Sequence, residues 1–172
     1  MRLGSEMGEN FGRGLLQTAR VGAALDLKGM LRGDRPTAIA VVIELMRGLT
    51  SLDLSQNKLD ANEAQMLGSV LSTTSSLISL NLCKNGIGPT GCQAVGRAVA
   101  MNRSLREVNL LCNNIDVESA IILAQISREK KITFCGIAPG QTVADFTGQG
   151  LGPVDSILIS ASLEFMKSLK QV

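Results

Sequence analysis

The sequence predicts an α/β solenoid of stacked strand–turn–helix repeats, and three observations support that fold class. A leucine pattern recurs at residues 49–59, 77–87 and 105–115, with starts that are 28 residues apart. A fixed period of this size is typical of repeat arrays. The segments between the patterns carry apolar residues at helical spacing, and these stay in register with the period. Because one such unit cannot bury its apolar face alone, each repeat must pack against its neighbours.

The first half of each repeat predicts a short strand. When the first Leu is position 1, positions 4 and 6 are apolar in all three repeats, which is the alternation of a strand with one buried face. These residues are Leu52 and Leu54, Leu80 and Leu82, and Val108 and Leu110. The intervening positions 3, 5 and 7 are expected on the opposite, concave face of a parallel sheet. They are Ser51, Asp53 and Ser55; Ser79, Asn81 and Cys83; and Glu107, Asn109 and Leu111.

Position 9 predicts a structural asparagine ladder, formed by Asn57, Asn85 and Asn113. An amide side chain offers both a donor and an acceptor. Where the chain leaves the strand, it can therefore satisfy backbone groups that have lost their sheet partners.

The second half of each repeat predicts a helix on the convex face. Asp60, Gly88 and Asp116 align at its start, where Asp is a good cap and Pro89 suits a first helical turn. Apolar and small residues then recur in rows that are expected to face inward. The rows are Leu67, Val95 and Leu123; Val70, Ala98 and Ile126; Ala64, Cys92 and Ala120; and Gly68, Gly96 and Ala124.

The array extends upstream by one divergent repeat. Leu25 and Leu27 match positions 4 and 6, and Met30 replaces the ladder Asn. Residues 36–47 are expected to form the helix of this repeat. We assign residues 1–21 to an N-terminal helical or capping segment and residues 22–172 to the repeat array, with about five units.

The array also extends downstream, beyond an insertion. Gly152 and Pro153 repeat the Gly88–Pro89 pair and place position 1 of a fifth repeat at Gln141, 36 residues after Leu105. This spacing implies extra residues near 128–140, with a short extended piece and a turn. A further repeat begins at Leu169, and we expect the C-terminus to truncate it. The inward helix positions of the fifth repeat are predicted to be Ser156, Ile159, Ser160 and Ser162, and Gln149 stands at its position 9.

Composition argues against several classes of partner. The net charge of +2 gives no reason to expect nucleic acid or an anionic membrane surface. No apolar run approaches the roughly 18 residues of a membrane span, and no secretory signal pattern is visible. We therefore expect a cytoplasmic or nuclear protein with reduced cysteines.

The repeat LxxLxLxxNxL, with its 28-residue period and helical second half, resembles the leucine-rich repeat superfamily. More narrowly, it resembles the ribonuclease-inhibitor-like subfamily, which includes NOD-like receptor arrays and the Ran GTPase-activating protein. The resemblance covers residues 25–172. It implies a short horseshoe with a concave parallel sheet and convex helices, and it implies recognition of a protein partner by the concave face and the loops beside it.

The candidate partner-binding residues lie on this expected concave face and its rim. The position 5 row is polar and mildly acidic, so it suits a basic or hydrogen-bonding partner. The alternative is that these side chains only form a hydrated sheet face, since no aromatic or Arg anchor stands among them. The candidates are Ser51, Asp53, Ser55, Ser79, Asn81, Lys84, Glu107, Asn109 and Asp145.

Catalysis and metal binding have little support in the sequence. The chain has no His, so the commonest general base is absent, and its four Cys contain no CxxC pair. Cys92 aligns with Ala64 and Ala120, which favours a structural role. Glu63, Glu118 and Glu164 are expected on hydrated outer helix faces. No cofactor and no metal are predicted.

Two functions remain open. The first is a non-catalytic protein–protein interaction module. The second is a GTPase activator like the Ran regulator, for which no residue of the chain can be assigned. A fragment of a larger sensor or scaffold array, without separate activity, is a third hypothesis. An uncapped last repeat would also favour end-to-end self-association.

Overall fold

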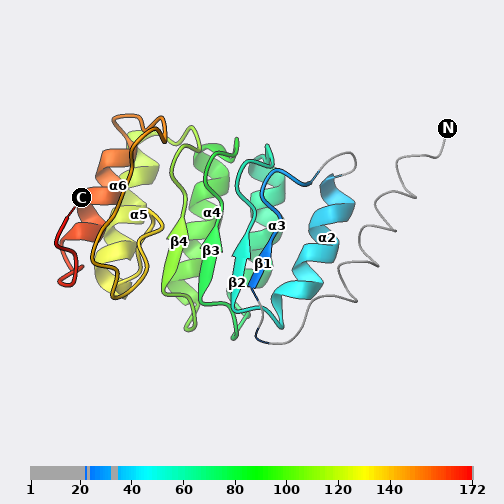
Figure 1. Ribbon diagram of the computed structural model, residues 1–172. Coiled ribbons are helices and arrows are strands. Elements are labelled where there is room, and N and C mark those ends of the chain that lie inside the picture. The colour runs from blue at the N-terminus through cyan, green and yellow to red at the C-terminus, as the bar shows by residue number, and fades with distance from the viewer. Residues whose placement is uncertain (1–21, 23, 32–34, 172) are drawn as a thin grey trace.

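The computed structural model describes residues 22, 24–31 and 35–171, and it shows a single-layered sheet backed by helices (Figure 1). Strands and helices alternate along the chain, as the repeat predicts. The strands are β1 (Ala24–Asp26), β2 (Ser51–Asp53), β3 (Ser79–Asn81) and β4 (Glu107–Asn109). The helices are α2 (Arg35–Met46), α3 (Ala61–Leu71), α4 (Gly88–Met101), α5 (Val117–Lys130) and α6 (Asp155–Leu163). The predicted segment 1–21 lies outside the described residues.

The four strands form a parallel sheet in the order β1-β2-β3-β4. Position 4 pairs with position 4 throughout, so Leu25 lies opposite Leu52, Leu52 opposite Leu80, and Leu80 opposite Val108. The repeat register read from the sequence is therefore the register of the sheet. Each of β2, β3 and β4 buries its middle residue and leaves the flanking residues half-buried. The outward face at positions 3 and 5 remains open to a partner.

The core lies between the sheet and the helices and is almost entirely aliphatic. The predicted inward row of Leu67, Val95 and Leu123 is fully buried, as are Ala64, Cys92 and Ala120. Gly96 shows why a small residue is needed in this layer, because a Cβ there would lie 2.7 Å from Leu123 Cδ2. Among the described helices, none is long and apolar enough to cross a membrane.

Local signals set the helix starts. Asp60 accepts from the Asn62 and Glu63 backbone N–H groups, and Glu63 Oε2 accepts from the Asp60 N–H at 2.8 Å, which completes a capping box. Asp116 caps α5 through the Ser119 N–H at 2.8 Å. At α4 no side chain caps the helix; instead Gly88 adopts φ +64 and Pro89 occupies the first turn.

The sheet continues past β4 in an unexpected way. The inserted segment, and not the fifth repeat, pairs with β4 through Glu107–Thr133 and Asn109–Cys135 bridges. Residue Val143, at position 3 of the fifth repeat, pairs instead with Gln171, which lies 28 residues later in the predicted register. The short extended piece expected within 128–140 thus takes the place beside β4.

The register of α6 differs by one residue from the prediction. The repeat predicts that Ser156, Ile159, Ser160 and Ser162 face inward, but Ser156 and Ser160 are exposed and Ile159 is only half-buried. The buried residues are Asp155, Leu158, Ala161 and Ser162, so only Ser162 of the four is buried as predicted. At the start of the helix, the buried Asp155 carboxylate accepts from two backbone N–H groups, a contact that the spacing rule does not detect.

Candidate functional site: the concave face

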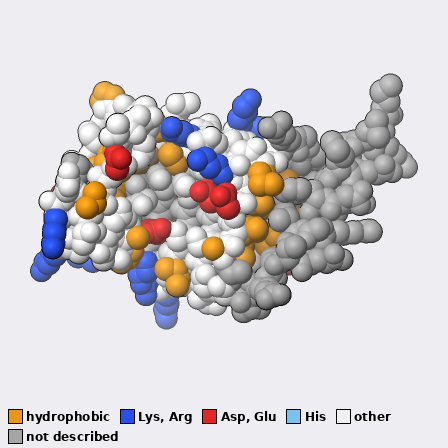
Figure 2. Space-filling model, in the orientation of Figure 1, with side chains coloured by type: hydrophobic (Ala, Val, Ile, Leu, Met, Phe, Trp, Pro, Cys, Tyr) orange, Lys and Arg blue, Asp and Glu red, His pale blue; other side chains and the backbone are white. Residues whose placement is uncertain are grey.

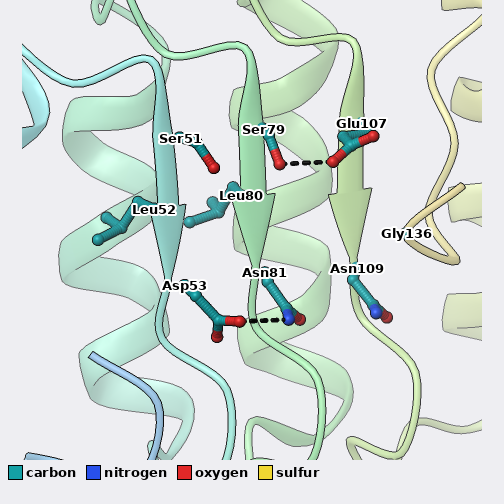
Figure 3. A pocket seen from close by; sticks show the side chains of 9 residues that line it. All are labelled: Ser51, Leu52, Asp53, Ser79, Leu80, Asn81, Glu107, Asn109 and Gly136. Atoms are coloured by element: carbon teal, nitrogen blue, oxygen red, sulfur yellow. Dashed lines mark hydrogen bonds between the residues drawn. The ribbon is translucent and has the colours of Figure 1, made fainter. Parts of the chain in front are cut away.

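A shallow hollow of about 240 Å³ lies across β2, β3 and β4 on the concave face (Figure 3). Positions 3 and 5 of three repeats supply its polar rim, and the segment after β4 supplies one end. The lining residues are Ser51, Leu52, Asp53, Ser79, Leu80, Asn81, Glu107, Asn109 and Gly136. The structure thus brings together six of the nine predicted partner-binding residues.

The position 5 side chains serve two purposes. Asp53 Oδ1 accepts from the Ser55 N–H at 2.7 Å, Asn81 Oδ1 from the Cys83 N–H at 3.0 Å, and Asn109 Oδ1 from the Leu111 N–H at 3.1 Å. Each residue therefore holds its own chain as it leaves the strand. Asn81 Nδ2 also donates to Asp53 Oδ2 at 2.9 Å, which links neighbouring repeats across the hollow (Figure 3).

The position 3 side chains make fewer hydrogen bonds to the protein than the position 5 side chains do. Ser79 Oγ donates to Glu107 Oε1 at 2.5 Å (Figure 3). The other oxygen of that carboxylate, Oε2, is shielded from solvent and has no hydrogen-bond partner among the described residues. Within the same part of the chain, no hydrogen bond holds the Ser51 hydroxyl. Position 3 is therefore the cleaner place to probe recognition by substitution.

The charge of the hollow is opposite in sign to that of the whole chain. Asp53 and Glu107 line it, and no Lys or Arg does, although the chain carries a net charge of +2. Figure 2 shows acidic side chains near the middle of this face, with basic side chains beside them. The hollow therefore favours a cationic or hydrogen-bonding group of a partner.

The sequence does not predict the end of the hollow beyond β4. Gly136 adopts φ +73 and lies so close to Asn109 that a Cβ would meet its Nδ2 at 2.6 Å. Gly136 belongs to the insertion, so the period offers no signal for it. Asp145, predicted to continue the position 5 row, does not line the hollow. It is exposed, and hydrogen bonds from Thr147 hold the pKa of its carboxyl below the ordinary value.

Two other predicted contact residues also lie outside the hollow. Ser55 is buried, at 3% exposure, because position 7 is covered by the preceding repeat, whose Gly29 N–H donates to the Ser55 carbonyl at 2.9 Å. The expectation that Ser55 lies exposed on the concave face is therefore wrong. Lys84 is exposed with φ +55 and lies at the strand exit rather than in the hollow. It remains a candidate for a rim contact only.

Asn57, Asn85 and Asn113 are buried and stack along the turn, as a ladder requires. Asn85 Nδ2 donates to the carbonyls of Leu54 and Leu82, at 3.1 and 2.9 Å. Asn85 Oδ1 accepts from the N–H groups of Asn57 and Leu59, at 2.9 and 3.0 Å. One side chain therefore pairs four backbone groups from two repeats. No ladder amide stands at position 30, where Met30 is 52% exposed.

The ladder is incomplete at its last member. Asn113 Nδ2 donates to the carbonyls of Leu82 and Leu110, at 2.9 and 3.0 Å. Its Oδ1 is buried and has no hydrogen-bond partner among the described residues. In the turn of the preceding repeat, the Gly86 N–H donates to the Leu59 carbonyl at 2.8 Å.

Asp155 is a structural residue that the sequence pattern does not reveal. In earlier repeats the position 8 N–H donates to the position 7 carbonyl of the next repeat, as Gln56 does to Cys83 and Lys84 does to Leu111. The insertion removes that partner for Cys112. The Asp155 Oδ1 atom replaces it at 2.9 Å, while Oδ2 accepts from the Gly152 N–H at 2.8 Å. One buried carboxylate thus joins the interrupted repeats.

The sequence predicts Glu63 on a hydrated outer face, and this prediction is wrong. Its residue exposure is 3%, and its Oε1 accepts from Arg35 Nε at 2.9 Å, which joins α2 to α3. By contrast, Glu118 and Glu164 are exposed, and Glu164 forms a two-bond ion pair with Arg128.

The surroundings of the four cysteines disfavour the thiolate form. Burial is the main cause that raises the pKa of Cys92 to about 12 and that of Cys83 to about 11. Burial also raises the pKa values of Cys112 and Cys135. Such thiols stay protonated near neutral pH and are inert. Within the described residues, no group of His, Cys, Asp and Glu is arranged to hold a metal ion.

We predict that Cys92 makes the protein lose stability as the pH rises above about 9. Its folded pKa is raised, so its contribution is fully present below the unfolded pKa of about 9 and is lost as the pH rises toward about 12. The expected slope in that window is about 1.4 kcal/mol per pH unit. Urea unfolding of wild type and Cys92→Ala between pH 8 and 10.5 measures it. Ala already stands at the equivalent positions 64 and 120. If the difference in free energy of unfolding between the two proteins does not change with pH, Cys92 is not responsible.

Comparisons with known proteins identify the fold. Residues 75–96 and 102–124 match the "Leucine Rich repeat" family model. The structure is similar to that of a tropomodulin C-terminal domain from Caenorhabditis elegans, with a TM-score of 0.64, 14% identity, and coverage of 91% of each chain. It is also similar to the structure titled leiomodin-1 actin-binding site 2, with a TM-score of 0.55 and 16% identity, over 95% of this chain and 91% of the other. No curated protein matches the sequence.

These findings agree with the periodicity and the sheet register. They do not confirm the narrower resemblance to the ribonuclease-inhibitor-like subfamily. The fold is therefore of the α/β leucine-rich repeat class, with alternating strands and helices and a parallel four-stranded sheet.

Proposed function

We propose that the chain is a non-catalytic protein-binding module that uses the concave face. The observation that carries the proposal is the hollow across β2, β3 and β4, lined by half-buried polar side chains from three consecutive repeats. Its volume of about 240 Å³ lies below the range of roughly 300–1,000 Å³ that is usual for small-molecule sites. A surface of this kind suits a protein segment better than a metabolite. We also propose a cytoplasmic or nuclear location, in which the thiols remain reduced.

A pull-down with one matched pair of variants tests the proposal. Glu107→Arg reverses the charge inside the hollow, and Glu129→Arg makes the same change on an exposed residue in the last turn of α5. We expect proteins retained by the wild type to be retained by Glu129→Arg and lost with Glu107→Arg. If the retained proteins are the same with both variants, recognition by the concave face is wrong.

Actin is a second, more specific candidate partner. The similarity to the structure titled leiomodin-1 actin-binding site 2 covers 95% of this chain, and this likeness is the reason to test actin first. Co-sedimentation with actin filaments, together with titration of monomeric actin, should show binding that Glu107→Arg weakens and Glu129→Arg does not. If the chain binds neither form of actin, this partner is excluded.

One assay distinguishes the binding-module proposal from the alternative that the chain is a GTPase activator like the Ran regulator. A GTPase activator must place residues that complete the catalytic site of the GTPase. We expect no acceleration of GTP hydrolysis by Ran when this chain is added. A stimulated rate would contradict the non-catalytic proposal.

A further inference from the structure

We propose that the concave hollow receives an arginine side chain from the partner protein. This inference rests on the proposed function and specifies its chemistry. Three features support it: the charge of the hollow, its size and the incompletely paired carboxylate of Glu107, which lines it.

The negative charge of the hollow favours a positively charged group of the partner. Glu107 on β4 and Asp53 on β2 flank β3, and neighbouring strands lie about 4.8 Å apart. A positive group above β3 would lie roughly 5 Å sideways from each of those strands, within the screening length of about 8 Å at physiological salt. Among the described residues, no Lys or Arg lines the hollow, so none of their cations occupies the position.

The volume of the hollow suits a single side chain of the partner. A volume of about 240 Å³ equals roughly eight waters at about 30 Å³ each. One long side chain fills such a space, whereas a folded element would rest on the rim. The alternating half-buried and buried residues of β2, β3 and β4 provide a floor, with Leu52 and Leu80 beneath.

The Glu107 carboxylate selects a donor with several N–H groups. Its Oε1 atom accepts from Ser79, and its Oε2 atom has no partner among the described residues while it is shielded from water. An unpaired shielded acceptor is unfavourable, and a donor that reaches it removes the penalty. Because Oε2 is shielded, a donor in the hollow reaches the carboxylate first at Oε1, beside Ser79, and reaches Oε2 only when the carboxylate turns.

Arginine fits these conditions better than lysine. Its guanidinium is planar, is weakly hydrated, and carries five N–H donors in a fixed fork that matches a carboxylate. The acceptors around the hollow are spread over three strands, on Glu107, Asn81 and Asp53. A fork can address several of them, while the strongly hydrated ammonium of lysine acts as a point charge.

A peptide titration followed by NMR tests the inference without any protein partner. The probes are acetyl-Gly-Arg-Gly-amide and the same peptide with citrulline, which keeps the shape of arginine but has no charge. We expect the arginine peptide to produce saturable shifts at Ser79, Asn81, Glu107 and Asn109, and the citrulline peptide to bind about tenfold more weakly.

Three variants locate the site. Glu107→Gln should weaken the arginine peptide about tenfold, while Glu129→Gln, an equivalent change on an exposed convex residue, should leave it unchanged. Asp53→Asn keeps a side-chain acceptor for the Ser55 N–H, but it removes the charge and the oxygen that accepts from Asn81 Nδ2. It should weaken binding of the arginine peptide while the turn after β2 stays folded.

Three results would overturn the inference. They are equal binding of the two peptides, arginine-peptide shifts that survive Glu107→Gln, and shifts spread over the convex helices. If the pull-down still shows loss with Glu107→Arg in any of these cases, the proposed function stands and only the arginine assignment falls.

Discussion

Replacement of Asn85 by Ala should destabilise the protein more than the loss of either other ladder asparagine. The change leaves the N–H groups of Asn57 and Leu59 without their partner, whereas the Leu54 and Leu82 carbonyls keep the amide groups of Asn57 and Asn113. Each buried unpaired group costs about 1–3 kcal/mol. For two such groups the cost is about 2–6 kcal/mol, a large fraction of the about 5–15 kcal/mol by which an ordinary domain is stable.

The ladder itself provides the controls. Oδ1 accepts two backbone N–H groups in Asn85, one in Asn57 (from Leu31 at 2.7 Å), and none among the described residues in Asn113. The Asn→Ala cost, measured as the loss in free energy of urea unfolding, should therefore fall in the order 85, 57, 113. Equal costs at the three positions would show that burial volume, and not the amide bonds, sets the effect.

Replacement of Asp155 by Ala should also destabilise the protein strongly. It removes both acceptors that serve Cys112 N–H and Gly152 N–H, at an expected cost of about 2–6 kcal/mol. Asp155→Asn keeps the volume but can accept only one of the two bonds, so its cost should be about half.

The matched control for Asp155 is Asp145→Ala, which removes an exposed carboxylate from the same repeat. Its effect should be within about 0.5 kcal/mol, as is usual for surface changes. Urea unfolding measures all three variants, and hydrogen exchange of α6 should be faster in Asp155→Ala. If Asp155→Ala and Asp145→Ala cost the same, the carboxylate does not join the repeats.

The fold was predictable because the residues that form its strands and core recur with a fixed period in the sequence. Leu52, Leu80 and Val108 recur at one spacing, and the sheet pairs them in that order. Positions 3 and 5 followed from the same alternation, which is why most of the hollow could be named from the sequence. The burial of Ser55 could not, because the preceding repeat covers position 7 through backbone contacts that leave no mark in the residue pattern.

The remaining differences arise at the insertion. Gly136 lies at one end of the hollow, against Asn109, and Asp155 accepts from the Cys112 N–H; both contacts are distant in sequence. The match of Gly152–Pro153 to Gly88–Pro89 predicted where the repeat begins. However, it could not show that a buried carboxylate replaces a missing main-chain acceptor.

Recognition by the concave face is tested most directly by site-specific photocrosslinking. A benzophenone amino acid at Ser51, whose side chain lines the hollow, is compared with one at Gln125, which is exposed on α5. Both proteins are irradiated in the presence of the same cell extract, and covalent adducts are counted by mass. We expect partner adducts from position 51 that excess unlabelled wild type competes away, and none from position 125. Adducts from position 125 alone, or equal yields from both positions, would contradict the assignment of the concave face as the binding surface.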